Sequence, residues 1–201
     1  MSWCPDFEFR VTQINDWLNV VDIAPRLHLR AASFCMAQGD NSDEIGFTQG
    51  MSAFLPNMTF LQPPGYVHAM VHATWQPNAL NVSIAGPAAA SPDRYGSSWN
   101  ASFSSSAAIS DDHGTTIVRL LNNHTSAIEV TIAAVYVAAT CNATLLAAAS
   151  LWGAAAENHP SMPHRVSPVS LSVSGCGATA ATAASPKVVL PPHSYAIVVL
   201  A

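Results

Sequence analysis

The sequence has few charged residues and no long apolar run. Only 9% of its 201 residues are charged, and the formal net charge is −5. The seven Lys and Arg residues form no cluster, so neither nucleic acid nor an anionic membrane surface is expected as a partner. No apolar segment reaches the roughly 18–20 residues that a membrane-spanning helix needs. The first ten residues lack a basic start and an apolar core, so no signal peptide is predicted.

Motifs of several enzyme classes are also missing. There is no Gly-x-Ser-x-Gly elbow and no Gly-rich loop leading to Lys-Ser/Thr, which excludes the usual serine-hydrolase and nucleotide sites. His68 and His72 have a metal-compatible spacing but no evident third ligand, and His159 and His164 flank two prolines in a loop. Residues 111–114, Asp-Asp-His-Gly, fit a tight surface turn better than a calcium site. We therefore predict no metal and no cofactor.

Hydrophobic residues make up 50% of the chain, which is enough for a sizeable core. Residues 115–139 read as two strands joined by a polar turn, that is, a hairpin. In the second strand Ile128, Val130 and Ile132 alternate with Glu129 and Thr131, the period of a strand with one buried face. Residues 133–139 are apolar on both faces, so this strand is expected to end inside the protein. Because a lone hairpin is marginal in water, a surrounding sheet and a covering sheet are also expected.

Helix signals vanish near residue 80 and turn residues recur from there on. Short apolar stretches follow at 143–152, 168–173, 188–190 and Ser194–Leu200, separated by Gly, Pro or Asn. Such spacing is typical of an antiparallel β-sandwich, which we assign to residues 79–201. Two loops are also expected, over residues 86–106 with a strand at 99–103, and over the low-complexity residues 175–186.

The first 78 residues show a different pattern of predicted elements. A strand is predicted over residues 7–11, a helix over 25–38, a strand with its exit loop over 44–54, and a helix over 66–75 just after Gly65. Alternating strands and helices are the signature of α/β units around a parallel sheet.

Sequons and cysteines bear on the compartment. Five Asn-x-Ser/Thr sequons occur, at Asn57, Asn81, Asn100, Asn123 and Asn142. Together they favour a secreted parent protein, although each alone is weak. Of the four cysteines, Cys141 and Cys176 lie in the strand-rich part and are the candidate disulfide; free buried thiols are the alternative. Sequons without a signal peptide suggest that a longer parent supplies the start.

Five segments carry a resemblance to one family. They are IVRLLNNHTSAIEVTI, LWGAAAENHPSMPHRVSPVSLSVS, VVLPPHSYAIVVL, AASFCMAQGDNSDEIGFTQGMSAFLPN and VTQINDW. The first three resemble the β-sandwich that ends the α-L-arabinofuranosidases of glycoside hydrolase family 51. The fourth is similar to the last helix and strand of that family's (β/α)8 barrel, and the fifth to its seventh-strand segment. The implied fold is mainly β: a C-terminal antiparallel sandwich of jelly-roll type (79–201) preceded by a partial barrel remnant (1–78).

The resemblance also implies what the chain lacks. The family's nucleophilic glutamate matches Gln13 here, and its acid/base glutamate belongs to a fourth barrel strand that has no match in this chain. A retaining glycosidase needs two carboxyl groups about 5–5.5 Å apart, and an amide cannot replace the nucleophile. Glu8 is the nearest carboxylate, and a shifted alignment with the family would put it in the site instead. Two strands cannot close a barrel, so part of the first segment should lack its normal packing.

We therefore expect the C-terminal portion of an enzyme that removes terminal α-L-arabinofuranosyl residues, with this chain alone inactive. Its partner would be an arabinose-containing glycan, met through the parent enzyme. The alternatives are a non-catalytic carbohydrate-binding module and a purely structural or degenerate product. Trp17 is the aromatic residue best placed to face substrate; Trp3, Trp75, Trp99 and Trp152 are expected in the core. Glu157-Asn158 is assigned a structural role at the sandwich edge.

Overall fold

The computed structural model describes residues 52–55, 57–86, 103–133, 139–148, 158–177 and 185–201. Its elements are β1 (Ser52–Leu55), β2 (Met58–Leu61), α3 (Pro63–Ala73), β3 (Asn78–Leu80), β4 (Phe103–Ile109), β5 (Thr116–Asn122), β6 (Ile128–Thr131), β7 (Cys141–Ala147), β8 (Val169–Leu171), β9 (Lys187–Leu190) and β10 (Ser194–Leu200). None of the helices described is long and apolar enough to cross a bilayer.

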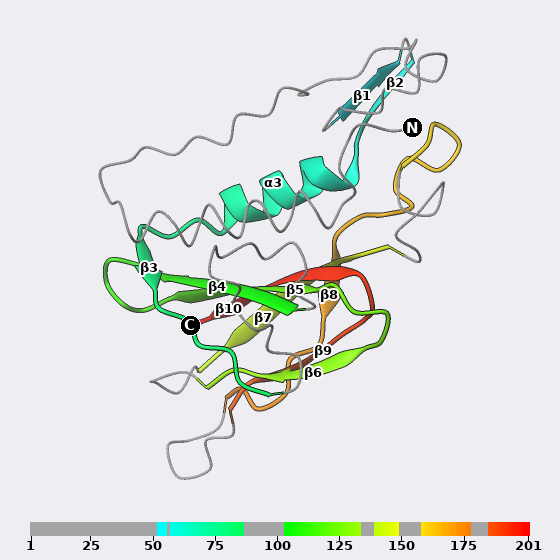
Figure 1. The fold of residues 1–201 in the computed structure, drawn as a ribbon. Coiled ribbons are helices and arrows are strands. Elements are labelled where there is room, and N and C mark those ends of the chain that lie inside the picture. Colours follow the sequence, from blue (N-terminus) through cyan, green and yellow to red (C-terminus); the bar gives the residue numbers. More distant parts are fainter. Residues whose placement is uncertain (1–51, 56, 87–102, 134–138, 149–157, 178–184) are drawn as a thin grey trace, which may run out of the picture.

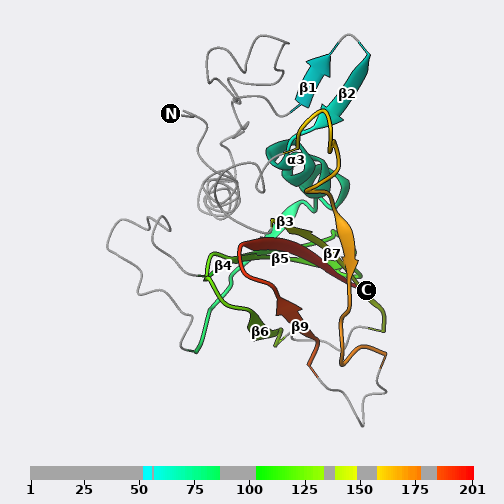
Figure 2. The same cartoon turned by 90° about the vertical axis from the view of Figure 1, so that its right-hand side faces the viewer.

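A six-stranded antiparallel sheet in the order β3-β4-β5-β10-β7-β8 forms the middle layer. The antiparallel pair β6–β9 lies across one face of this sheet, and α3 lies across the other (Figures 1 and 2). The β1–β2 hairpin stands at the end of α3 where that helix begins. The prediction of a mainly β structure with two antiparallel sheets is confirmed, whereas the jelly-roll type and the barrel remnant stay predictions.

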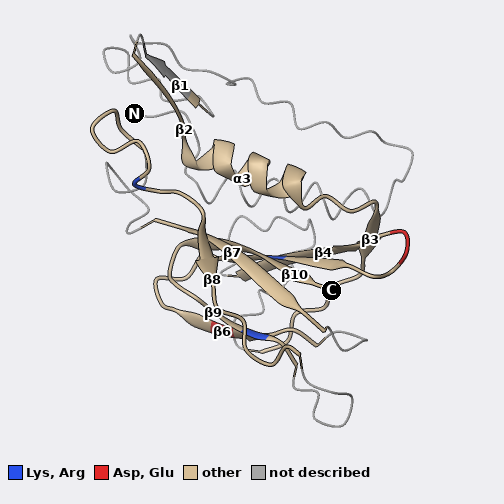
Figure 3. Cartoon of the chain, turned by 180° about the vertical axis from the view of Figure 1, so that it is seen from behind, with Lys and Arg blue, Asp and Glu red and all other residues tan. Residues whose placement is uncertain are grey.

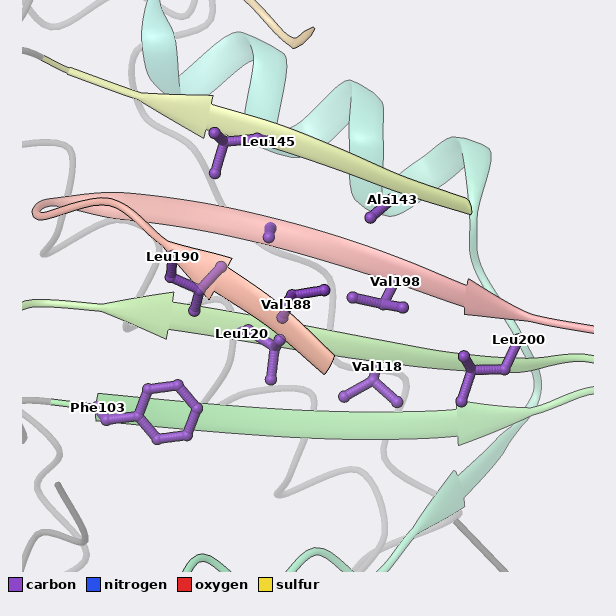
Figure 4. Close-up of a cluster of buried hydrophobic side chains, with 10 residues drawn as sticks. Phe103, Val118, Leu120, Ala143, Leu145, Val188, Leu190, Val198 and Leu200 are labelled. Carbon is purple, nitrogen blue, oxygen red and sulfur yellow. The ribbon is translucent and has the colours of Figure 1, made fainter. Parts of the chain in front are cut away.

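Strand β10 is apolar on both faces because both faces of the sheet are covered. On one face, Val198 and Leu200 pack with Val118 and Leu120 of β5 and with side chains of β9, as Figure 4 shows. On the other face, Tyr195 and Ile197 lie in a second buried cluster with side chains of α3. Burying each such side chain contributes about 1.5–3 kcal/mol, so two covered faces favour an uninterrupted apolar strand over an alternating one.

Helix α3 begins earlier than the sequence predicted, at Pro63 rather than after Gly65. Proline is tolerated in the first turn of a helix because its missing N–H has no intrahelical partner there. Gln62 precedes the helix with extended backbone. Val67 and Met70 are the buried side chains of α3 that join the second cluster, so this helix is held mainly by packing on the sheet.

The predicted hairpin of residues 115–139 is wrong, although both of its strands exist. β5 pairs with β4 and β10, whereas β6 pairs with β9 in the other sheet. Buried Asn122 explains why the chain passes from one sheet to the other between β5 and β6. Its Nδ2 donates to the carbonyls of Ser126 (3.0 Å), Leu190 (3.2 Å) and Pro191 (2.7 Å), and its Oδ1 accepts from His124 N (2.9 Å). The turn residues therefore connect the two sheets instead of folding β6 back onto β5.

Strand β4 corrects the long loop predicted over residues 86–106. It begins at Phe103 and continues through three serines and two alanines to Ile109, pairing with β3 and β5. Small residues have weak strand propensity, but the two neighbouring strands supply the pairing that decides their conformation. The predicted strand residues 99–102 lie outside the described residues. So do residues 134–138 of the predicted apolar strand end, while β6 itself stops at Thr131.

The remaining strands lie close to their predicted positions. β10 has the predicted bounds, β9 begins one residue earlier, β8 is shorter, and β7 spans Cys141–Ala147 where 143–152 was predicted. In the first 78 residues, the strand expected at 7–11 and the helix expected at 25–38 lie outside the described residues.

Candidate functional site

Three residues singled out by the resemblance lie outside the part of the chain that the structure describes. They are Gln13, which matches the family's nucleophile position, Glu8, the nearest carboxylate, and Trp17, the candidate substrate-facing residue. Among the residues that the structure does describe, no three His, Cys, Asp or Glu side chains form a group that could hold a metal ion. His68 is half-buried and His72 is exposed, both on α3. A buried polar site lies elsewhere, where the loop of residues 158–167 meets the start of α3.

We call this site the Asn158 junction and define it by Leu61, Gln62, Asn158 and Val166. Asn158 Nδ2 donates to the carbonyls of Leu61 (2.7 Å) and Val166 (2.9 Å), while its Oδ1 accepts from Val166 N (2.7 Å). The Gln62 side chain pairs with the Asn158 backbone in both directions: Nε2 donates to the carbonyl (2.8 Å) and Oε1 accepts from N (2.9 Å). Asn158 is only 3% exposed. Its hydrogen bonds with Gln62 connect two residues that are 96 positions apart in the sequence.

An exposed polar surface adjoins the junction. The Tyr66 hydroxyl and His164 Nδ1 are 3.1 Å apart, which links α3 to the loop. Within the loop, His159 Nδ1 lies 3.0 Å from Ser161 Oγ, and the Arg165 guanidinium donates to the sulfur of Met162. The loop stands beside β2 and the start of α3 (Figures 1 and 2).

The hydroxyl and imidazole groups of this surface are donors and acceptors of the kind that hydrogen-bond to sugar hydroxyls, and the Tyr66 ring is of the kind that packs on a sugar ring. The described part of the loop carries no Asp or Glu, so this surface by itself provides no pair of carboxyl groups for glycoside cleavage.

Residues 111–114 form the predicted turn, between β4 and β5. Asp112 Oδ1 accepts from Gly114 N (3.0 Å) and from the Ser110 hydroxyl. The Ser110 and Gly114 hydrogen bonds lower the pKa of the Asp112 carboxyl. The neighbouring Asp111 accepts from Asn78 Nδ2 at 2.9 Å, which anchors the turn to β3.

The candidate disulfide is present: Cys141 at the start of β7 is bonded to Cys176, 35 residues away. Three of the sequon asparagines are exposed, namely Asn57, Asn81 and Asn142. Asn123 is half-buried, and Asn100 lies outside the described residues. Trp75, expected in the core, is instead 58% exposed beyond the end of α3, so its predicted burial is wrong. The other four tryptophans lie outside the described residues.

Comparison with known proteins gave matches only among solved structures; no family model and no curated protein sequence matches the chain. A family 51 α-L-arabinofuranosidase from Bifidobacterium longum superposes with a TM-score of 0.67 and 15% identity, over 98% of this chain and 35% of the other. An α-L-arabinofuranosidase from Thermotoga maritima, solved as an arabinose complex, gives 0.60 and 11%, over 96% of this chain and 47% of the other. The chain has the fold of part of the family 51 arabinofuranosidases.

The fold is not confined to that family. The catalytic domain of a GH30 xylanase from Talaromyces cellulolyticus matches with a TM-score of 0.53 and 16% identity, over 82% of this chain and 29% of the other. This chain spans about a third of the length of the Bifidobacterium protein.

Sequence reasoning assigned Asn158 a structural role but missed Gln62 as its partner. Gln62 precedes Pro63-Pro64, and a long polar side chain just before a helix is a weak signal. Because 96 residues separate the two, nothing in the sequence indicates that their amides meet.

Proposed function

We propose that the chain is the C-terminal portion of a longer α-L-arabinofuranosidase-like glycoside hydrolase. It would carry the last elements of a (β/α)8 barrel in residues 1–78 and a sandwich of jelly-roll type in residues 79–201. The observation that carries the proposal is the match to the Bifidobacterium enzyme over 98% of this chain. The five sequence segments that resemble the family supply independent support.

The reaction of the parent enzyme would be removal of terminal α-L-arabinofuranosyl residues with retention of configuration. Such a reaction needs a nucleophilic carboxylate and a second carboxyl group as acid/base. In this chain Gln13 stands at the position that matches the nucleophile. We therefore expect this chain to be inactive by itself and to brace the barrel in the parent, with the Asn158 junction holding the sandwich loop against the start of α3.

The direct test is hydrolysis of 4-nitrophenyl α-L-arabinofuranoside by this chain and by a product extended with the coding sequence upstream of Met1. Activity in the extended product and none in this chain supports the proposal. Turnover by this chain above background contradicts the inactivity expected from Gln13. Because a xylanase shares the fold, 4-nitrophenyl β-D-xyloside is the comparison substrate. An extended product that cleaves only the xyloside would overturn the arabinose assignment.

A non-catalytic carbohydrate-binding role is the second candidate, and exposed Trp75 is the observation that favours it. An exposed indole can stack on a sugar ring. Affinity electrophoresis in arabinoxylan would measure this binding. If arabinoxylan retards the unmutated chain but not Trp75→Ala, the result supports a binding module. Equal mobility of the two chains opposes it.

We further propose that the parent protein is secreted. The Cys141–Cys176 disulfide supports this, since such bonds persist in oxidising compartments. The exposed sequon asparagines Asn57, Asn81 and Asn142 are accessible to a glycosyltransferase. Glycosidase treatment of protein from a secreting eukaryotic host tests this: no mass shift would count against glycosylation.

A further inference from the structure

The sequon at Asn142 lies in a different structural setting from the other two exposed sequons. Asn57 lies in the turn between β1 and β2, and Asn81 directly follows the last residue of β3. Asn142 is the second residue of β7, the strand between β10 and β8 in the six-stranded sheet. A sequon is an acceptor for a glycan where it lies in a surface loop. Asn57 and Asn81 meet that condition in the folded chain, whereas Asn142 does not.

Neighbouring strands hold the backbone of the Asn142 sequon on both sides. On one side β10 pairs with the whole of β7, and Val199 lies opposite Asn142. On the other side β8 pairs with Ala143 and with Thr144, the hydroxyl residue of the sequon. Figure 3 shows β7 and β8 side by side, with α3 over one face of the sheet and β6 and β9 over the other. Lifting residues 142–144 out of the sheet would break pairings with two strands.

A disulfide fixes the start of the same strand. Cys141, directly before Asn142, is bonded to Cys176, 35 residues along the chain. Beside this bond, the backbones of Thr140 and Ala201 exchange two hydrogen bonds of 2.8 and 3.0 Å, which close the end of the β7–β10 pair. Local opening of a fold begins most easily where strands end. The disulfide therefore anchors the sequon at the end of β7 from which it would otherwise open.

The side chains of Asn142 and Cys141 point to opposite faces of the sheet. Successive residues of a strand alternate between the two faces. Cys141 and Leu145 pack in the cluster between the sheet and β9, whereas Leu146 lies in the cluster between the sheet and α3. Asn142 shares the α3-facing side with Leu146 and is exposed there. A glycan on Asn142 is therefore compatible with the disulfide in the finished fold, and only the order of the two reactions is restricted.

We propose that Asn142 accepts an N-glycan only before Cys141 bonds to Cys176. Asn57 and Asn81 accept theirs irrespective of that bond, since both lie in exposed connections outside the strands. This deepens the glycosylation proposed above and rests on the proposed secretion. Chain synthesis at about 5–20 residues per second delivers Cys176 roughly 2–7 seconds after Asn142. The interval for modification opens with the synthesis of the sequon and ends when the disulfide closes.

The two reactions are chemically independent. In the first, the side-chain nitrogen of Asn142 bonds to C1 of a lipid-linked oligosaccharide, the bond from C1 to the diphosphate oxygen breaks, and the amide loses a proton. In the second, the thiols of Cys141 and Cys176 lose their protons and a pair of electrons, which reduce the disulfide of a thiol oxidoreductase. Neither reaction consumes a group of the other. The disulfide therefore affects glycan transfer only by fixing the backbone of the sequon.

The occupancy of each sequon tests the proposal. The full chain is produced behind an added signal peptide in a secreting eukaryotic host, so the natural targeting of the parent does not enter. Peptide N-glycosidase in heavy-oxygen water marks each formerly glycosylated asparagine, and mass spectrometry gives the occupied fraction. In the unmutated chain, the occupancy of Asn142 should be about half that of Asn57 and Asn81 or less. Cys176→Ser should raise it about twofold or more, with little change at the other two sequons.

Val67→Ala is the matched control. Val67 is a fully buried residue of α3, so this variant lowers stability without touching the disulfide, and it should leave the occupancy of Asn142 unchanged. If Cys176→Ser is not secreted, occupancy is measured on the protein retained in the cell. A second measurement uses the unmutated chain with a membrane-permeant reductant present during synthesis, which should raise the occupancy of Asn142 in the same way.

Four results would overturn the proposal. Full occupancy of Asn142 in the unmutated chain is one, and unchanged occupancy in Cys176→Ser is another. An equal rise in Val67→Ala and Cys176→Ser would assign the effect to slower folding in general. Modification of none of the three exposed sequons is the fourth. Because the signal peptide is supplied, a natural parent that is not secreted would contradict only the secretion proposal, and the arabinofuranosidase assay is a separate measurement.

Discussion

Replacing Asn158 with alanine should loosen the contact between the sandwich loop and α3. The amide makes three side-chain hydrogen bonds, to Leu61 O, Val166 O and Val166 N, at 2.7–2.9 Å. A typical hydrogen bond contributes about 1 kcal/mol net, and a buried partner left unsatisfied costs about 1–3 kcal/mol. Because Asn158 is only 3% exposed, water cannot readily replace the lost partners. We expect a loss of about 3 kcal/mol in the free energy of unfolding.

Asn158→Asp provides a sharper version of the same experiment. An aspartate keeps an acceptor for Val166 N but places a second oxygen against the carbonyls of Leu61 and Val166. Burial and these carbonyls disfavour the ionised form, so the folded pKa of the new carboxyl should lie above its unfolded value of about 4. Its protonated form is then the better tolerated one. The variant should therefore be less stable than the unmutated chain at neutral pH, and this difference in stability should shrink as the pH falls.

The assay is urea unfolding followed by circular dichroism, with hydrogen exchange at the Val166 amide as a local probe. Asn81→Ala is the matched control, since Asn81 is exposed and should change stability by less than about 0.5 kcal/mol. Equal stability of Asn158→Ala and Asn81→Ala would refute the reasoning, because it would mean that the three bonds contribute nothing net. Unchanged exchange at Val166 would refute the local part separately.

Three further predictions follow from the fold. Reducing the Cys141–Cys176 bond, which closes 35 residues, should lower the free energy of unfolding by about 3–4 kcal/mol, measured by urea titration with and without reductant. Because the pKa of Asp112 is lowered in the folded chain, this carboxylate stabilises the fold above about pH 4, and the stabilisation declines as the pH falls further. Asp112→Asn should therefore reduce the pH dependence of the free energy of unfolding in that range. An unchanged pH dependence would contradict the turn geometry. Val67→Ala, at a fully buried position, should cost about 1–3 kcal/mol in thermal unfolding, while Val189→Ala, at a 54% exposed one, should cost under about 1 kcal/mol; equal effects would mean that α3 is not held by packing.

Local chemistry determined much of the secondary structure. Alternation and apolar runs located β6, β9 and β10, and turn residues separated them, because side-chain period and backbone preference act over a few neighbouring residues. The sequence predicts that the helix starts only after Gly65, whereas Pro63 and Pro64 open α3, because proline fits the first turn of a helix as well as a loop.

Pairing and partnership were decided only by the tertiary structure. β6 joins β9 because Asn122 binds the carbonyls at the end of β9, and the serines of β4 become a strand because β3 and β5 flank them. Asn158 meets Gln62 across 96 residues. Arg119 is buried, although the local sequence pattern gives no sign that a charged residue of β5 is covered. These outcomes depend on contacts between distant segments, and such contacts form only when the layers pack.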